Sequence, residues 1–376
     1  MKIGLKLILF VGILMQWGCA TKTNFLKETL ASDHPKIKNV MSNPEAFELQ
    51  IIYTQILRDK NNKVRFKDFA YRLDANNYFY PASTVKFPFT LMALEKLNTI
   101  PGTSMYDTFT IDGNPAAYKF TDEMTKVFAV SDNEASNHLF EWIGFDYLNQ
   151  GMHDKSLAPF RIAHRLQTPN SGNPLVLKVT IIKEDGTQFA SEEKLNSTST
   201  PLPIKGLKKG KGYYKDGVLI NEPFDFAQKN YYPLETLHNT LKRLVFPESF
   251  AGSERFNLTN EQRDFVLFSM SNLPKNAGYD PKEYYDGYCK FFMFGDTKEN
   301  IPANIKIYDK VGDAYGTLID CAYIVDTENK VEFMVSATLL VNKDRIFNDD
   351  AYDYDAIGFP FLAELGRQLY AKNLNK

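Results

Sequence analysis

The chain contains stretches whose apolar residues follow the spacing of strands, placed near its two ends. Five runs are rich in apolar and β-branched residues and are bounded by turn residues, as buried strands are. They lie at 47–58, 64–73, 305–311, 316–326 and 331–341. The first two are separated by Asp59-Lys60-Asn61-Asn62, which predicts a β-hairpin.

Helical spacing of apolar residues dominates the middle of the chain and its C-terminal end. It is present at 83–98, 121–143, 232–244, 259–270 and 352–370. The first of these stretches is apolar on most sides, so we expect a central, buried helix. Two early strands, a helical middle, three late strands and a closing helix predict an α+β fold. We expect one antiparallel five-stranded sheet flanked by helices, an α/β sandwich, with a helical lobe at about 88–255.

A polar stretch interrupts the helical middle. Residues 175–229 hold short alternating runs, turns and many Lys and Gly residues. We expect them to form an inserted β excursion. The lysines at 205–211 are expected to be solvated.

The first residues are typical of a targeting segment. Lys2 and Lys6 precede an apolar run that is too short to span a bilayer and ends at Gly18-Cys19. Residues 1–18 are therefore expected to be a lipoprotein-type signal peptide, with Cys19 as the lipidation site. Plain secretory cleavage and an uncleaved anchor are the alternatives. Residues 19–46 are expected to form a tether and a first helix. Each alternative places the mature protein outside the cytoplasm, in the periplasm or on the outer membrane of a bacterium.

Composition excludes several classes of function. The 376 residues carry a formal net charge of −2, without the basic excess that is usual for nucleic-acid binding. The histidines and cysteines lack the spacing of metal ligands, and no nucleotide-binding motif is present, so we expect no metal and no cofactor. Outside the targeting segment only Cys289 and Cys321 remain. They either form a disulfide or are simply buried.

A serine and a lysine with helical spacing are the first candidate for chemistry. Ser83 and Lys86 are three positions apart and lie on one face of the expected helix. A hydroxyl becomes a good nucleophile when a neighbouring base takes its proton, and a lysine with a lowered pKa can be that base. A helix start also offers free N–H groups to an oxyanion. The alternative is structural, with Ser83 as a helix N-cap and Lys86 solvated.

Two further motifs follow in the chain. Ser131-Asp132-Asn133 is one, although Ser131 with Glu134 also fits a capping box opening a helix at Glu134–Trp142. Lys310-Val311-Gly312 is the other, although in isolation a strand end entering a turn is the better explanation of it. Together with Ser83 and Lys86 these motifs resemble the joint signature of the serine β-lactamase and penicillin-binding protein superfamily, closest to class A β-lactamases.

The resemblance implies a serine hydrolase domain at 47–376 and a role for each matched residue. Ser83 would be acylated, and Lys86 would take or relay its proton. Ser131 would take part in proton transfer, and Asn133 would position the substrate. Lys310 would lie on the edge strand, attract a substrate carboxylate and depress the pKa of Lys86.

Residues around the third motif complete the implied binding site. The backbone N–H groups of Ser83 and Asp313 would form the oxyanion hole, with Gly312 and Val311 beside the substrate. Val311 stands where the family usually has Thr or Ser, so one hydrogen bond to the substrate carboxylate is expected to be missing.

A second departure concerns the Arg-Leu-Asp-x-x-Glu segment of class A enzymes, whose Glu positions the water that hydrolyses the acyl-enzyme. The best match begins at Arg165 and places Asn170 at the Glu position, and no Asp or Glu occurs between Asp154 and Glu184. An amide is no general base, so we expect acylation with slow or unusual deacylation.

Three functions remain open. The first is an extracytoplasmic hydrolase that forms an acyl-enzyme on Ser83 with β-lactams or related amides and esters. The second is a D-Ala-D-Ala-type peptidoglycan peptidase or esterase with the same fold. The third is a non-catalytic envelope protein that binds a small molecule or a peptidoglycan-derived ligand. Contact with a membrane is expected only through the N-terminal segment, and no oligomeric state follows from the sequence.

Overall fold

A five-stranded antiparallel sheet forms the centre of the protein. The computed structural model describes residues 24–375, and the segment at 1–18 and Cys19 lie outside them. The sheet has the strand order β13-β14-β15-β1-β2. Its strands are β1 (Gln50–Arg58), β2 (Val64–Tyr71), β13 (Ile305–Ala314), β14 (Thr317–Asp326) and β15 (Val331–Leu340). The expected fold class is confirmed, and β13 is an edge strand, as predicted.

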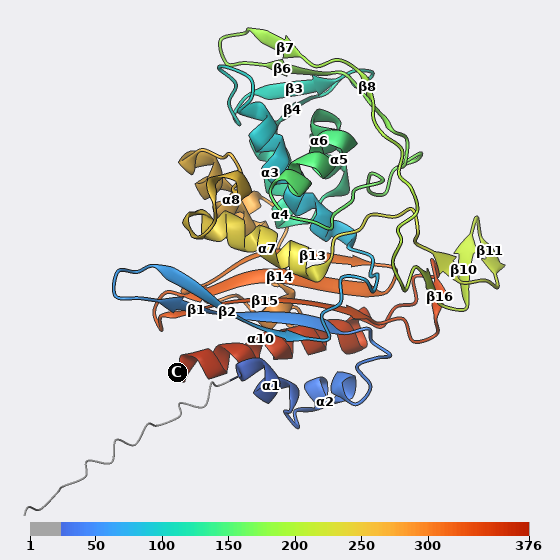
Figure 1. Ribbon diagram of the computed structural model, residues 1–376, viewed down its shortest axis with the longest axis vertical. Helices are drawn as coiled ribbons and strands as arrows, with labels where there is room; N and C mark the ends of the chain where they lie inside the picture. Colours follow the sequence, from blue (N-terminus) through green and yellow to red (C-terminus); the bar gives the residue numbers. More distant parts are fainter. Residues whose placement is uncertain (1–23, 376) are drawn as a thin grey trace, which may run out of the picture.

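Both faces of this sheet are buried, because side chains alternate along each strand. In β1, Ile52 and Ile56 belong to one apolar cluster, whereas Ile51 and Tyr53 belong to another on the opposite face. The helical lobe covers the first face, and four helices cover the second (Figure 1).

The layer on the second face consists of α1 (Phe25–Leu30), α2 (Pro35–Met41), α9 (Phe291–Phe294) and α10 (Phe359–Leu374). Figure 1 shows α10 beneath the sheet, with α1 and α2 against it. Where we expected a polar tether and one helix, residues 24–41 thus hold two short helices in the core. The cause is that Leu26, Leu30, Ile37 and Val40 lie at helical spacing and are all buried.

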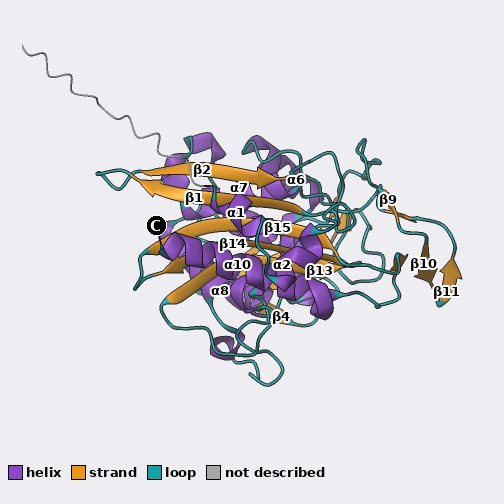
Figure 2. Cartoon of the chain, turned by 90° about the horizontal axis from the view of Figure 1, so that it is seen from below, coloured by secondary structure: helices purple, strands orange, loops and turns teal. Residues whose placement is uncertain are grey.

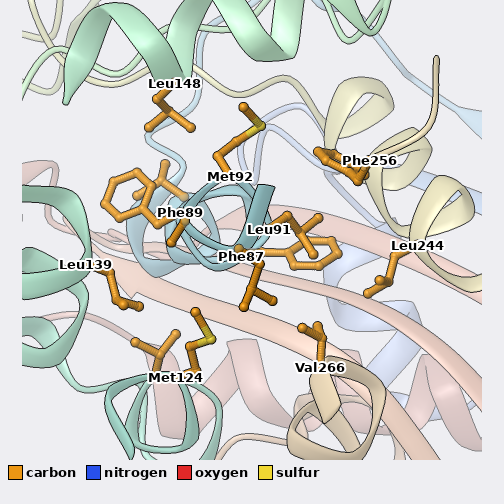
Figure 3. Close-up of a cluster of buried hydrophobic side chains, with 14 of the residues drawn as sticks. Phe87, Phe89, Leu91, Met92, Met124, Leu139, Leu148, Leu244, Phe256 and Val266 are labelled. Carbon is orange, nitrogen blue, oxygen red and sulfur yellow. The ribbon is translucent and has the colours of Figure 1, made fainter. Parts of the chain in front are cut away.

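Helix α3 (Lys86–Leu97) runs through the middle of the lobe, and all of its residues except Lys96 are buried. It is entered through a short 3-10 turn, η1 (Ala82–Val85). Around it lie α4 (Phe120–Ala129), α5 (Asn133–Ile143), α6 (Phe145–Asp154), α7 (Leu234–Val245) and α8 (Asn260–Ser271). Figure 3 shows Phe87, Phe89 and Met92 of α3 surrounded by side chains from these helices. Shorter turns lie at Pro247–Ser249, Gly252–Glu254, Pro274–Ala277 and Tyr354–Gly358.

Residues 175–229 run from the top of the lobe to the end of the sheet (Figures 1 and 2). They hold β5 (Leu175–Val176), β6 (Val179–Ile182), β7 (Gln188–Ala190), β8 (Lys194–Leu195), β9 (Lys208–Lys209), β10 (Gly212–Lys215), β11 (Val218–Ile220) and β12 (Phe224–Asp225). Within the lobe, β6 and β7 extend a sheet begun by β3 (Thr108–Ile111) and β4 (Ala117–Lys119). Further on, β10 pairs in parallel with β16 (Ile346–Phe347). The segment therefore links the lobe to the chain that follows the central sheet.

The two cysteines do not pair. Both are free and buried, with Cys321 in the apolar cluster under the lobe and Cys289 in the cluster on the other face of the sheet. Among residues 24–375, no helix is long and apolar enough to cross a membrane.

Candidate active site

The entry to α3 positions Ser83 and Lys86. The chain turns at Pro81, whose carbonyl accepts hydrogen bonds from the Thr84 N–H at 3.1 Å and the Thr84 hydroxyl at 2.6 Å. Ser83 is half-buried in this 3-10 turn, whereas Lys86 is completely buried at the first position of α3. The turn thus leaves the hydroxyl accessible and removes the lysine from water.

The link between α4 and α5 carries Ser131. The predicted capping box is wrong, because the N-cap of α5 is Asp132, whose Oδ1 accepts from the Ala135 N–H at 2.8 Å. Ser131 itself has a left-handed φ of 58°, a conformation that costs a non-glycine residue about 1–2 kcal/mol. Because Asp132 provides the cap, the hydroxyl of Ser131 can form hydrogen bonds with other groups.

Edge strand β13 brings the third motif against this turn. A Cβ at Gly312 would lie 2.8 Å from the Ser83 nitrogen and 3.0 Å from the Thr84 nitrogen, so only glycine allows the approach. Val311 is buried at the margin of the cavity described below and packs into the cluster on the second face of the sheet. Asp313 follows on the exposed end of the strand.

Lys86 and Lys310 converge on the hydroxyl of Ser131. The Nζ of Lys310 donates to Ser131 Oγ at 2.8 Å, and the Nζ of Lys86 donates to the same oxygen at 3.3 Å. Lys86 also donates to the Ser131 carbonyl. Within the described chain Ser83 Oγ has no hydrogen bond to either lysine. The serine of the second motif therefore bridges the lysines of the first and third.

Two buried amines this close together repel each other when both are protonated, so the neutral form of one of them is favoured. Burial lowers the pKa of Lys86 well below its usual value, and the positive charge of Lys310 lowers it further. Burial also lowers the pKa of Lys310, to about 8. Lys86 is thus the better candidate for a neutral amine, and Lys310 for the cation, near neutral pH.

The loop after α6 contacts the second motif. Asn133 Nδ2 donates to Gln167 Oε1 at 2.6 Å, which joins the start of α5 to this loop. Arg165 holds the loop in place, because its guanidinium donates hydrogen bonds to the carboxylate of Glu141 and to the carbonyl of Asn173. Gln167 therefore sits beside the second motif.

Asn170 does not take the expected place. It is exposed and is absent from the walls of the cavity that Ser83 lines, whereas Gln167 and Thr168 line that cavity. The backbone has a positive φ at both residues, 44° at Gln167 and 52° at Asn170, so their distance along the chain does not decide which of them faces the cavity. The residue that faces the site is again an amide.

A cavity of about 800 Å³ joins these residues. Ser83, Ser131, Asn133, Val311 and Asp313 all line it. Much of its remaining wall is aromatic, which the motifs did not indicate; these residues are Tyr80, Tyr285, Tyr288, Phe291, Tyr315, Tyr352, Tyr354 and Phe359. The 21 tyrosines and 29 phenylalanines of the sequence fit either a well-packed core or an aromatic-lined cleft, so they did not decide between the two. Within residues 24–375, no group of three or more His, Cys, Asp or Glu side chains could hold a metal ion.

Comparisons with known proteins identify similar sequences and folds. The model of the Beta-lactamase enzyme family matches residues 34–201. No curated protein sequence matches the chain. A class A β-lactamase from Bacteroides cellulosilyticus is 12% identical, with a TM-score of 0.52 and coverage of 94% of this chain and 100% of the other.

Two further solved structures are similar. A β-lactamase from Sphaerobacter thermophilus is 11% identical, with a TM-score of 0.51 and coverage of 92% of this chain and 94% of the other. A β-lactamase from Xanthomonas campestris is 13% identical, with a TM-score of 0.51 and coverage of 92% and 96%. The expected likeness to the serine β-lactamase superfamily is thereby confirmed, and at this identity the structures establish the fold.

Proposed function

Since this chain is a β-lactamase-like protein in sequence and fold, we propose that it is a serine hydrolase that forms an acyl-enzyme on Ser83 with β-lactams or related amides and esters. The observation that carries the proposal is the convergence of two buried lysines on the Oγ of Ser131, a residue that lines the same cavity as Ser83. A purely structural role would not require two buried amines on one hydroxyl, neither of which forms an ion pair within residues 24–375.

The acylation step needs a base, an oxyanion site and a proton donor. Neutral Lys86 takes the proton of Ser83 as Oγ attacks the carbonyl carbon. The backbone N–H groups of Ser83 and Asp313 receive the developing oxyanion, and each such donor is worth about 3–4 kcal/mol in other hydrolases.

The leaving nitrogen is protonated through the second motif. Ser131 gives its hydroxyl proton to that nitrogen as the C–N bond breaks. Lys86 returns the proton taken from Ser83 across the 3.3 Å contact with Ser131 Oγ. Lys310, held at 2.8 Å from the same oxygen, keeps the hydroxyl oriented and attracts a substrate anion.

Deacylation is proposed to be slow. The loop beside the site presents Gln167 and Thr168 to the cavity and no carboxylate, and an amide cannot take a proton from water. The acidic residues on the cavity wall are Asp313 and Asp350, which come from elsewhere in the chain. The acyl-enzyme on Ser83 would therefore persist.

Gln167→Glu tests this reasoning. A glutamate is nearly isosteric and its carboxylate still accepts the hydrogen bond from Asn133, so the loop should keep its place. We expect the deacylation rate to rise at least 10-fold, since a positioned general base contributes about 10²–10⁴-fold. Single-turnover decay of the acyl-enzyme, followed by intact mass, measures it. Asn170→Glu is the matched control and should change nothing, and a reversed order of the two variants would contradict the assignment of Gln167.

Acylation itself is tested by trapping with a fluorescent penicillin. We expect covalent label on the wild-type protein, on the peptide containing Ser83, and none on Ser83→Ala. Absence of label on the wild type across pH 6–9 would reject a penicillin-recognising function. In that case the non-catalytic envelope binding protein would take its place.

A peptidoglycan peptidase or esterase of the D-Ala-D-Ala type is the second candidate. A specific feature favours it: a second cavity adjoins the first and extends the space available to a substrate beyond the size of a compact lactam. Release of alanine from peptidoglycan fragments by wild type, lost in Ser83→Ala, would establish this activity.

We also propose that the protein acts outside the cytoplasm, anchored through a lipid on Cys19. The support is the sequence of the N-terminal segment. Metabolic labelling with a radioactive fatty acid should mark the wild type and leave Cys19→Ser unmarked. Label on neither protein would contradict lipidation.

A further inference from the structure

A lysine and a histidine that have no role in the proposed acylation lie where two cavities meet. The cavity of about 800 Å³ that contains Ser83 shares His164, Ser171 and Lys229 with a neighbouring cavity of about 440 Å³. The second cavity is lined further by small hydroxyl side chains at Ser197, Thr198 and Ser199. The shared residues form the boundary across which an extended ligand would pass.

The side-chain amine of Lys229 has no acidic partner in the part of the chain that the structure describes, and burial lowers its pKa. It is half-buried, and within residues 24–375 its ammonium forms no ion pair and no hydrogen bond. Its Nζ lies 5.9 Å from the centroid of the Phe224 ring. Asp225, which lines the second cavity, is exposed, and its Oδ1 accepts a hydrogen bond from the Ala227 N–H at 2.8 Å. A partly desolvated ammonium of this kind favours an anionic partner.

His164 offers the complementary group. It is 7% exposed, and its Nδ1 lies 2.6 Å from the Arg165 carbonyl, which can only accept, so Nδ1 carries the proton. Burial lowers the pKa of His164 to about 4, so the ring is neutral at pH 7. The other nitrogen, Nε2, is then an acceptor, and it is buried without a partner among the described residues. The ring lies parallel to that of Tyr80 at 6.1 Å.

Hydrogen bonds from the side chains of Asn230 and Arg161 to the backbone fix the positions of the segments that carry His164 and Lys229. Asn230 Oδ1 accepts from the N–H groups of Ala163 at 2.8 Å and His164 at 3.1 Å, and its Nδ2 donates to the His164 carbonyl. The guanidinium of Arg161 donates to the carbonyls of Ala227 and Lys229. The segment that carries Lys229 is thus fastened to the segment that carries His164, and the site is organised before any ligand binds.

We propose that Lys229 and His164 form a subsite for a carboxylate-bearing peptide group of the substrate that acylates Ser83. The ammonium of Lys229 receives the carboxylate, and Nε2 of His164 accepts a hydrogen bond from an amide N–H next to it. This inference rests on the proposed function for its substrate role. It names the substrate class as extended peptides with a free carboxylate.

The subsite is tested in the full chain carrying Ser83→Ala, in which binding is measured without acylation. The probes are N-acetyl-alanyl-alanine as the free acid and as the C-terminal amide, each in the L,L and D,D forms. Calorimetric titration gives their dissociation constants. We expect the acid to bind at least about 10-fold more tightly than the amide.

Two variants assign the groups. In the same background, Lys229→Met should raise the Kd of the acid about 10-fold and leave that of the amide unchanged, whereas Lys229→Arg should keep the preference. His164→Phe should weaken acid and amide alike, about fivefold, since both probes carry the N–H. Lys178→Met, at an exposed lysine outside both cavities, is the control.

The outcomes separate the subsite from the proposed function. Equal binding of acid and amide, an equal effect of Lys229→Met on both, or no binding by the acid in either form would overturn the subsite. If Lys229→Met lowers the melting temperature, the comparison of acid with amide and the effect of Lys229→Arg decide whether the subsite exists. If Lys229→Met abolishes the preference for the acid over the amide, the subsite is retained. If the wild type at the same time takes no penicillin label on Ser83, the proposed acylation is rejected.

Discussion

At the scale of single residues, the candidate site depends on removing two amines from water next to a hydroxyl held in an unfavourable backbone conformation. Lys86 is completely buried, and Lys310 is 2% exposed. Ser131 joins them with a left-handed φ. Strain of this kind is often kept where it serves a function, which agrees with a proton-relaying role for Ser131.

Replacement of Ser131 separates backbone strain from chemistry. Ser131→Gly should be more stable than Ser131→Ala by about 1 kcal/mol, because glycine adopts a positive φ without strain. Both variants should lose acylation of Ser83 by at least about 10²-fold, since the proton donor is absent. Thermal unfolding and the rate of penicillin labelling measure the two effects. Equal stability of the two variants would contradict the strain at Ser131.

The lysine pKa values predict the pH profile of acylation. The rate should rise with pH as Lys86 loses its proton, at a pH well below the usual lysine range. It should fall above about pH 8, as Lys310 becomes neutral and loses its hold on an anionic substrate. In Lys310→Met the acid limb should move to higher pH, because the repulsion that lowers the pKa of Lys86 is gone. A profile that is flat from pH 6 to 9 would contradict these roles.

At the scale of elements, the site lies where η1, the link before α5 and the edge strand β13 meet. The sequence predicted β13 and the helix after Ser83 because their apolar residues are continuous and strongly patterned. It did not predict that Gln167 rather than Asn170 faces the cavity, since the positive φ at both residues leaves no trace in apolar spacing. The spacing of residues within a loop gives only their distance along the chain. Which side chain faces the cavity depends on the direction of the backbone at each residue.

Gly312→Ala tests the close approach of β13 to η1. The added methyl would meet the Ser83 nitrogen at 2.8 Å, which forces the strand away from the turn and spoils the oxyanion site. We expect the acylation rate to fall about 10²-fold or more, as when an oxyanion donor is lost. Gly252→Ala, where the methyl would meet nothing within 4 Å and the backbone has no positive φ, controls for loss of a glycine. An unchanged rate in Gly312→Ala would contradict the proposed oxyanion site.

At the scale of the whole molecule, one apolar cluster joins the lobe to the sheet. It includes Phe89 and Leu139 of the lobe together with Ile52 and Ile319 of the sheet. The sequence indicated the sheet and its order of elements, because both ends of the chain carry strands. The abundance of Tyr and Phe left an aromatic-lined cleft open as an alternative, but the residues that form the wall could not be predicted, because they come from segments far apart in the chain.

A shared core predicts one cooperative unfolding transition for lobe and sheet. Phe89→Ala should lower the free energy of unfolding by about 3–5 kcal/mol, because Phe89 is fully buried against Phe140 at the centre of the lobe. Phe268→Ala, at a side chain that is 63% exposed, should change it by less than about 0.5 kcal/mol. Urea unfolding followed by fluorescence and circular dichroism measures both. Two separate transitions would contradict a shared core.

The most direct test of the account is the reaction of the purified protein with a chromogenic cephalosporin, with intact mass recorded on the same sample. The account predicts a burst of one equivalent of product, then slow turnover, and a persistent mass adduct on Ser83 that is absent from Ser83→Ala. Rapid steady turnover without an adduct, lost in Ser83→Ala, would contradict slow deacylation. No burst and no adduct would contradict Ser83 as an acylated nucleophile for β-lactams.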